Sequence, residues 1–84
     1  MSERFNRREL HASSGRDWDI VEAIADSIFV ILIGNPNTVI TEEHVKNEAA
    51  KIASEWGIEI DNVSYVIQNV LINLPGLRNA AKIR

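Results

Sequence analysis

The chain has 84 residues, enough for one small domain, and it is 45% hydrophobic and 25% charged, as globular proteins usually are. It contains no cysteine, which excludes disulfide bonds, zinc–thiolate sites and thiol catalysis. The longest stretch rich in apolar residues, 20–33, includes two acidic residues and is shorter than the roughly 20 residues that span a bilayer. The polar N-terminus does not have the pattern of a secretory signal. We therefore expect a soluble, cytoplasmic protein that does not enter membranes.

The net charge of −3 is unevenly distributed along the chain. Residues 1–16 and 78–84 together carry seven basic residues against two acidic ones, whereas residues 17–77 carry ten acidic residues against two basic ones. Residues 1–16 also lack apolar periodicity, which is typical of an arm that has no packed face. We interpret the chain as a flexible basic arm (1–16), an acidic helical domain (17–77) and a short basic tail (78–84).

The first predicted helix covers about 18–33, with Asp17 as its N-cap. Gly34 followed by Pro36 is a typical stop signal. The acidic residues 19, 22 and 26 recur on one face of this helix, and at 100° per residue the same face continues with Phe29, Val30 and Ile33. The polar stripe thus becomes apolar halfway along the helix, which indicates that something covers it.

The competing interpretation makes 28–33 a buried β-strand, because four of its six residues are β-branched. We prefer the helix because the chain has no second strand of similar quality to pair with it. The dipeptide Val39–Ile40 is too short for that purpose.

The second predicted helix covers about 41–56. Thr41 is a good N-cap, acidic residues fill the first turn, and Gly57 is a typical C-terminal signal. The apolar residues follow the spacing of one buried stripe: Val45, Ala49, Ile52, Ala53 and Trp56.

The third predicted helix covers about 61–74, with Asp61 as its cap and an end before Pro75–Gly76. Residues 62–77 contain no charged side chain, although solvated helix faces usually do. The predicted outward positions are Ser64, Tyr65, Gln68, Asn69, Ile72 and Asn73. Depletion of charge is typical of interface cores. Three helices of this kind predict an all-α, three-helix bundle.

No pattern in the chain points to catalysis. The two histidines, His11 and His44, form no metal-binding or metalloprotease motif, and there is no phosphate loop or nucleophile elbow. The early carboxylates have a spacing that also suits a solvated helix face, and no metal-loop glycine accompanies them. We therefore expect no enzymatic activity, no catalytic residue, no metal, no cofactor and no small-molecule ligand.

The segment 52–58 followed by 63–67 resembles the helix-turn-helix motif of DNA-binding proteins. It has a small residue four before the turn glycine, an apolar residue just after the glycine, and apolar positions six, nine and ten beyond it. The resemblance implies that the second helix reads bases, through Asn62, Ser64, Tyr65, Gln68 and Asn69. It leaves phosphate contacts to the basic ends, namely Arg4, Arg7, Arg8 and Arg16.

Two features depart from the motif. Glu59 and Asp61 stand at the leading end of the second helix, where phosphate repulsion is strongest, and the segment contains no basic residue there. Glu55 also occupies a position that is usually apolar in the family. Nucleic-acid binding is therefore the alternative hypothesis.

The preferred hypothesis is a protein–protein interaction module, such as an adaptor, an inhibitor or an accessory subunit. Its partner is a second copy, forming a homodimer, or another protein. The predicted interface residues are Phe29, Val30, Ile33, Tyr65, Gln68, Asn69, Ile72 and Asn73.

Overall fold

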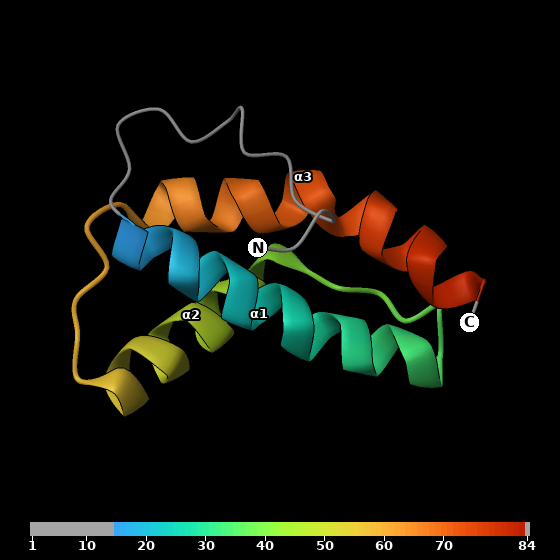
Figure 1. Cartoon of the computed structure of the whole chain (residues 1–84), viewed down its shortest axis with the longest axis horizontal. Helices are drawn as coiled ribbons and strands as arrows, with labels where there is room; N and C mark the ends of the chain where they lie inside the picture. Colours follow the sequence, from blue (N-terminus) through green and yellow to red (C-terminus); the bar gives the residue numbers. More distant parts are fainter. Residues whose placement is uncertain (1–14, 84) are drawn as a thin grey trace.

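The computed structural model describes residues 15–83, which form three helices: α1 (Gly15–Gly34), α2 (Glu42–Trp56) and α3 (Val63–Lys82). α1 and α3 lie side by side and run in the same direction, and α2 packs against both (Figure 1). The prediction of a small all-α three-helix bundle is confirmed. Residues 28–33 belong to α1, so the β-strand alternative for this segment is wrong.

A continuous buried face explains why the first segment is helical. Its fully buried apolar residues recur at helical spacing: Ile20, Val21, Ile24, Ala25, Ile28 and Leu32. The helix ends at Gly34 because Pro36 cannot continue it. α1 starts at Gly15, so Gly15 and Arg16 belong to the helix and not to the predicted arm.

α2 follows its local sequence signals closely. The Thr41 hydroxyl accepts a hydrogen bond from the His44 backbone N–H at 3.1 Å, as expected of an N-cap. Gly57 adopts a left-handed conformation with φ of 68°, and it ends the helix. One expectation is wrong: Trp56 is 47% exposed, because it lies at the end of the helix where the buried stripe runs out.

α3 begins at Val63, and its N-cap is Asn62 rather than Asp61, because the Asn62 side-chain oxygen accepts from the Tyr65 backbone N–H at 3.0 Å. The predicted end before Pro75 is also wrong. The helix continues through Pro75 and Gly76 to Lys82 and bends along its length (Figure 1). Residues 78–82 of the predicted basic tail are therefore helical.

Packing against the core explains why α3 continues past Pro75. The buried stripe does not stop at Pro75 but repeats every three or four residues: Val66, Val70, Asn73, Leu77 and Ala81. Pro75 removes one backbone hydrogen bond, and the burial of the last two members of the stripe offsets that loss.

Arg78 holds the connection between α1 and α2 against α3. Its guanidinium donates to the backbone carbonyl oxygens of Pro36 and of Thr38, the latter at 2.9 Å. The side chain is half-buried. A residue that the sequence assigned to a basic tail thus has a structural role.

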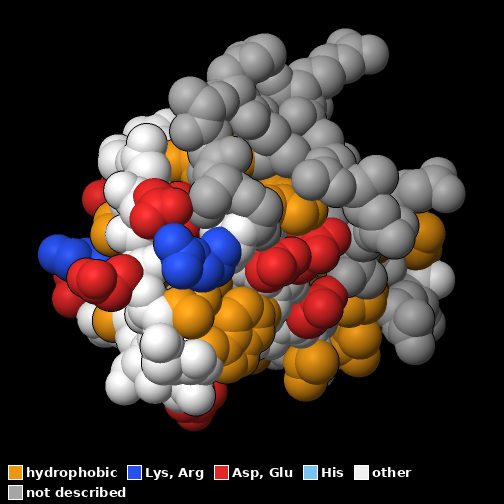
Figure 2. Space-filling model, turned by 60° about the vertical axis from the view of Figure 1, so that its left-hand side comes forward, with side chains coloured by type: hydrophobic (Ala, Val, Ile, Leu, Met, Phe, Trp, Pro, Cys, Tyr) orange, Lys and Arg blue, Asp and Glu red, His pale blue; other side chains and the backbone are white. Residues whose placement is uncertain are grey.

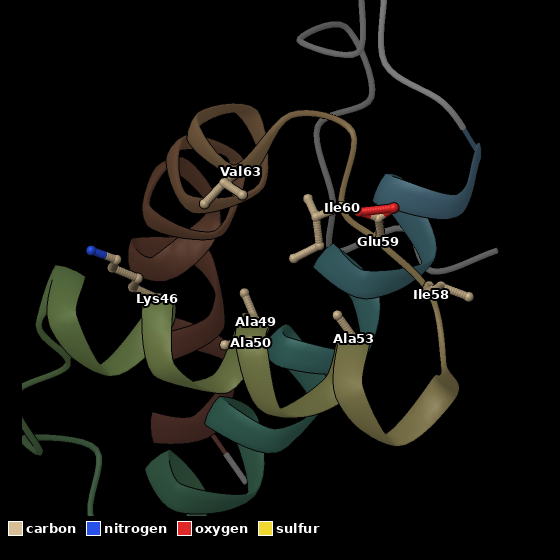
Figure 3. A pocket seen from close by; sticks show the side chains of 8 residues that line it. All are labelled: Lys46, Ala49, Ala50, Ala53, Ile58, Glu59, Ile60 and Val63. Carbon is tan, nitrogen blue, oxygen red and sulfur yellow. The ribbon is translucent and has the colours of Figure 1, made fainter.

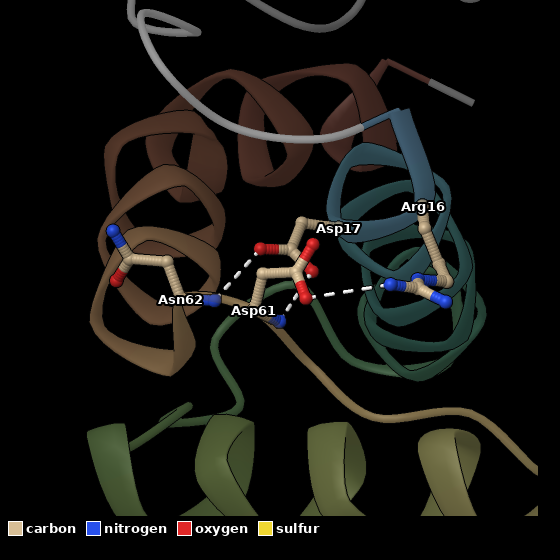
Figure 4. Close-up of polar contacts among 4 residues, drawn as sticks. All are labelled: Arg16, Asp17, Asp61 and Asn62. Atoms are coloured by element: carbon tan, nitrogen blue, oxygen red, sulfur yellow. Dashed lines mark hydrogen bonds and ion pairs between the residues drawn. The ribbon is translucent and has the colours of Figure 1, made fainter.

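Asp17 joins the start of α1 to the start of α3 (Figure 4). Its fully buried carboxylate accepts hydrogen bonds from the backbone N–H groups of Asp61, at 3.0 Å, and Asn62, at 2.9 Å. Arg16 donates to the Asp61 carboxylate at 3.3 Å on the exposed side of this contact. The expectation that Asp17 caps the first helix is therefore wrong, because α1 already includes it and its carboxylate serves α3.

Candidate functional site

The outward side of α1 changes character along its length. Asp19 and Asp26 are exposed in its first two-thirds. Val30 is then 70% exposed and Ile33 is 42% exposed, although the opposite face of α1 is fully packed. Phe29 is half-buried and packs against the core. The structure therefore exposes two of the three apolar residues predicted on this helix.

The outward side of α3 is partly as predicted. Gln68 is exposed, Ile72 is 47% exposed, and Tyr65 is half-buried against the core. Asn69 and Asn73 are instead buried, at 2% and 6% exposed. The expectation that both face outward is wrong.

The two buried asparagines bond to the backbone of their own helix. The side-chain nitrogen of Asn69 donates to the Tyr65 carbonyl oxygen at 2.9 Å, and that of Asn73 donates to the Asn69 carbonyl oxygen at 2.8 Å. These bonds satisfy the donors inside the bundle, so an amide can occupy an edge of the buried face. Neither residue is available to a partner.

Side-chain contacts with α2 show which side of α1 and which side of α3 face that helix. The Ser27 hydroxyl donates to Glu48 of α2 at 3.3 Å, which marks the side of α1 that faces α2. Phe29 lies about 200° from Ser27 around the helix, on the side away from α2. Val63 lines a groove with α2, and Ile72 lies about 180° from Val63, also away from α2.

The predicted interface therefore divides into two surfaces. Phe29, Tyr65 and Ile72 border the face opposite α2, which we call the far face. Val30 lies only about 60° from Ser27, and Ile33 lies between Val30 and Phe29. We call Val30 and Ile33 the outer ridge of α1.

A groove that the sequence did not reveal lies between α2 and the segment that leads into α3 (Figure 3). It has a volume of about 350 Å³ and is mostly apolar. It is lined by Lys46, Ala49, Ala50, Ala53, Ile58, Glu59, Ile60 and Val63. In Figure 3, Lys46 stands at one end and Ile58 at the other, and the alanines of α2 form the floor. The alanine spacing was visible in the sequence, but the groove depends on how the 58–63 segment packs beside α2.

The candidate nucleic-acid residues are not brought together in the described part of the chain. Arg4, Arg7 and Arg8 lie outside the described residues. Arg16 is paired with Asp61, and the Asn62 side-chain oxygen caps α3. Ser64 is exposed.

The end of the molecule where α1 and α3 begin is rich in acid. Figure 2 shows acidic side chains spread across this face, with hydrophobic surface and a smaller amount of basic side chain between them. Glu59 and Asp61, just before α3, are both exposed. A phosphate backbone approaching α3 here meets like charge.

Within residues 15–83, no three side chains of the metal-binding types gather closely enough to hold a metal ion. None of the helices in this range has the length and apolarity that a bilayer crossing requires. His44 is half-buried at the start of α2. His11 lies outside the described residues.

No protein-family model, no curated protein sequence and no solved structure matches this chain.

Proposed function

We propose that this domain is a non-enzymatic protein-interaction module that self-associates through the exposed apolar and uncharged surfaces of α1 and α3. The observation that carries the proposal is the exposure of Val30, Ile33 and Ile72 on helices whose buried faces are complete without them. Removing such a side chain from water is worth roughly 1.5–3 kcal/mol. That gain is available only through a contact with another molecule or another part of the chain.

The charge pattern supports the same proposal. Residues 27–41 and 62–77 contain no charged side chain, and each stretch includes exposed positions. A surface without charge loses little hydration energy when it is buried, and interface cores are depleted of charge for this reason. The acidic residues elsewhere on the surface keep the isolated domain in solution.

We expect the Ile72→Glu variant to self-associate at least about tenfold more weakly than the wild-type chain, because the substitution replaces a buried apolar contact with a desolvated carboxylate. Sedimentation velocity over a range of protein concentrations measures the effect. The matched control is Ile83→Glu, which places the same charge at an 87% exposed position beyond the end of α3. A wild-type chain that stays monomeric at the highest concentration contradicts the proposal.

The competing proposal is DNA binding through α3 with phosphate contacts from the basic ends. The burial of Asn69 and the exposed carboxylates of Glu59 and Asp61 disfavour it. In a salt titration with a mixed-sequence duplex, followed by fluorescence anisotropy, we expect a flat baseline even at low salt. Binding that weakens steeply as salt rises would favour the DNA proposal instead.

A further inference from the structure

The outer ridge of α1 has a shape and a chemistry that another helix-lined surface can accept. Val30 and Ile33 are three residues apart, so they stand next to each other on one side of α1. They are 70% and 42% exposed. The stretch 27–41 around them carries no charge, so the ridge can enter an apolar site without taking a charge with it.

The groove beside α2 is the matching surface. Its floor is Ala49, Ala50 and Ala53, whose short side chains let another backbone come close. Ile60 and Val63 form its opposite wall. Ligand pockets combine such apolar walls with several convergent polar groups, whereas here the charged side chains are only Lys46 and Glu59. Aliphatic side chains of a protein therefore fit the lining better than a polar small molecule does.

The ridge of one copy cannot enter the groove of the same copy. Glu48 marks the side of α2 that contacts α1, through its hydrogen bond with Ser27. Ala50 follows two residues later, about 200° around α2, so the groove opens on the side turned away from that contact.

We propose that the Val30–Ile33 ridge of one copy packs into the alanine-floored groove of a second copy. The proposal rests on the self-association proposed above, and it adds a contact between the α1 ridge and the groove beside α2 to the contact through the far face. Packing a row of side chains from one helix into the groove beside another is the ordinary mode of helix contact.

The two charged residues that line the groove, Lys46 and Glu59, favour one direction of the contact. On α1, Asp26 and Glu22 precede Val30 by about one and two turns. In the groove, Lys46 stands at one end (Figure 3). When the acidic end of the ridge lies toward Lys46, opposite charges meet. At the other end of the ridge, the uncharged stretch 34–41 follows, so no acidic side chain of α1 comes near Glu59.

This contact joins two different surfaces, so each copy keeps one unused ridge or groove after pairing. Head-to-tail contacts of this kind build chains or closed rings rather than isolated symmetric dimers. A contact limited to one ridge and one groove lies below the roughly 1,200 Å² of stable interfaces, so we expect weak, concentration-dependent association.

Two variants of the full chain test the proposal. Val30→Glu removes the ridge, and Ala50→Glu fills the groove from an exposed position of α2. By sedimentation velocity we expect each variant alone to associate at least about tenfold more weakly than the wild-type chain, which grows beyond a dimer as its concentration rises. A mixture of the two variants should associate more strongly than either variant alone, because one intact ridge and one intact groove remain per pair. Asn47→Glu, an equal charge on α2 outside the groove, should behave like the wild-type chain.

The outcomes separate this proposal from the one on which it rests. Ala50→Glu associating like the wild-type chain, while Ile72→Glu does not, overturns the ridge-and-groove contact and leaves self-association through the far face. A mixture of Val30→Glu and Ala50→Glu that associates no more strongly than either variant alone also overturns the contact. A monomeric wild-type chain overturns both proposals. Circular dichroism confirms that each variant keeps its helical content.

Discussion

Replacing Asp17 with alanine should lower the free energy of unfolding by about 3 kcal/mol, because two backbone donors lose the buried carboxylate that accepts their hydrogen bonds. The donors are the N–H groups of Asp61 and Asn62, which lie 3.0 and 2.9 Å from the two carboxylate oxygens. Within residues 15–83, these N–H groups have no other hydrogen-bond acceptor. The carboxylate is also placed at the positive end of the α3 dipole, so its charge adds to the loss. Urea denaturation followed by far-ultraviolet circular dichroism measures the change.

Two further variants make the Asp17 result specific. Asp17→Asn keeps the shape and one acceptor oxygen, so we expect roughly half of the alanine effect. Asp19→Ala removes an exposed carboxylate two residues along the same helix, and its effect should stay within about 0.5 kcal/mol. Equal stability of Asp17→Ala and Asp19→Ala would show that the hydrogen bonds that Asp17 accepts at the start of α3 contribute nothing to stability.

The role of Asp17 also shows what local sequence signals can and cannot predict. Thr41 and Gly57 act on backbone groups within a few residues, and both were predicted correctly as the ends of α2. Aspartate is a favourable N-cap residue, so the sequence predicted that Asp17 caps its own helix. Its partners are 44 and 45 residues away in the chain, and only the packing of α1 against α3 brings them together.

The sequence likewise predicted only part of the candidate surfaces correctly. Helical periodicity placed Val30, Ile33 and Ile72 outward, and all three are exposed. The expectation failed for Asn69 and Asn73 because Asn73 lies within the buried stripe, three residues after Val70 and four before Leu77, and Asn69 lies about one turn before it. Their amides were interpreted as outward-facing because they are polar, but hydrogen bonds to the preceding turn let them be buried.

The groove could not be predicted from the sequence, for a different reason. Its floor comes from α2, and its other wall comes from the connection 58–60 and the first residue of α3. Ala49 and Ala53 contribute to the core as well, so their small size had a sufficient explanation in packing alone. Whether small residues leave an open groove depends on what packs beside them, and that is a property of the tertiary structure.

The end of α3 is where local and tertiary signals conflict most clearly. Pro75–Gly76 is a strong stop signal, and each residue disfavours a helix interior. The stop signal fails because Leu77 and Ala81 continue the buried stripe and Arg78 binds the carbonyl oxygens of the α1–α2 connection. Leu77, in this explanation, is the residue that keeps the last turns of α3 on the bundle.

We therefore expect Leu77→Ala to lower the free energy of unfolding by about 3–4 kcal/mol, as large-to-small changes at fully buried positions do. The effect should also be local, because the turns after Pro75 then lose their main apolar anchor. Amide hydrogen exchange should show lower protection over 77–82 than over 63–74, a difference larger than in the wild-type chain. Ile83→Ala, at an 87% exposed position, is the matched control and should change stability by less than about 0.5 kcal/mol. A Leu77→Ala variant as stable as this control would mean that the helix passes Pro75 without needing the buried stripe.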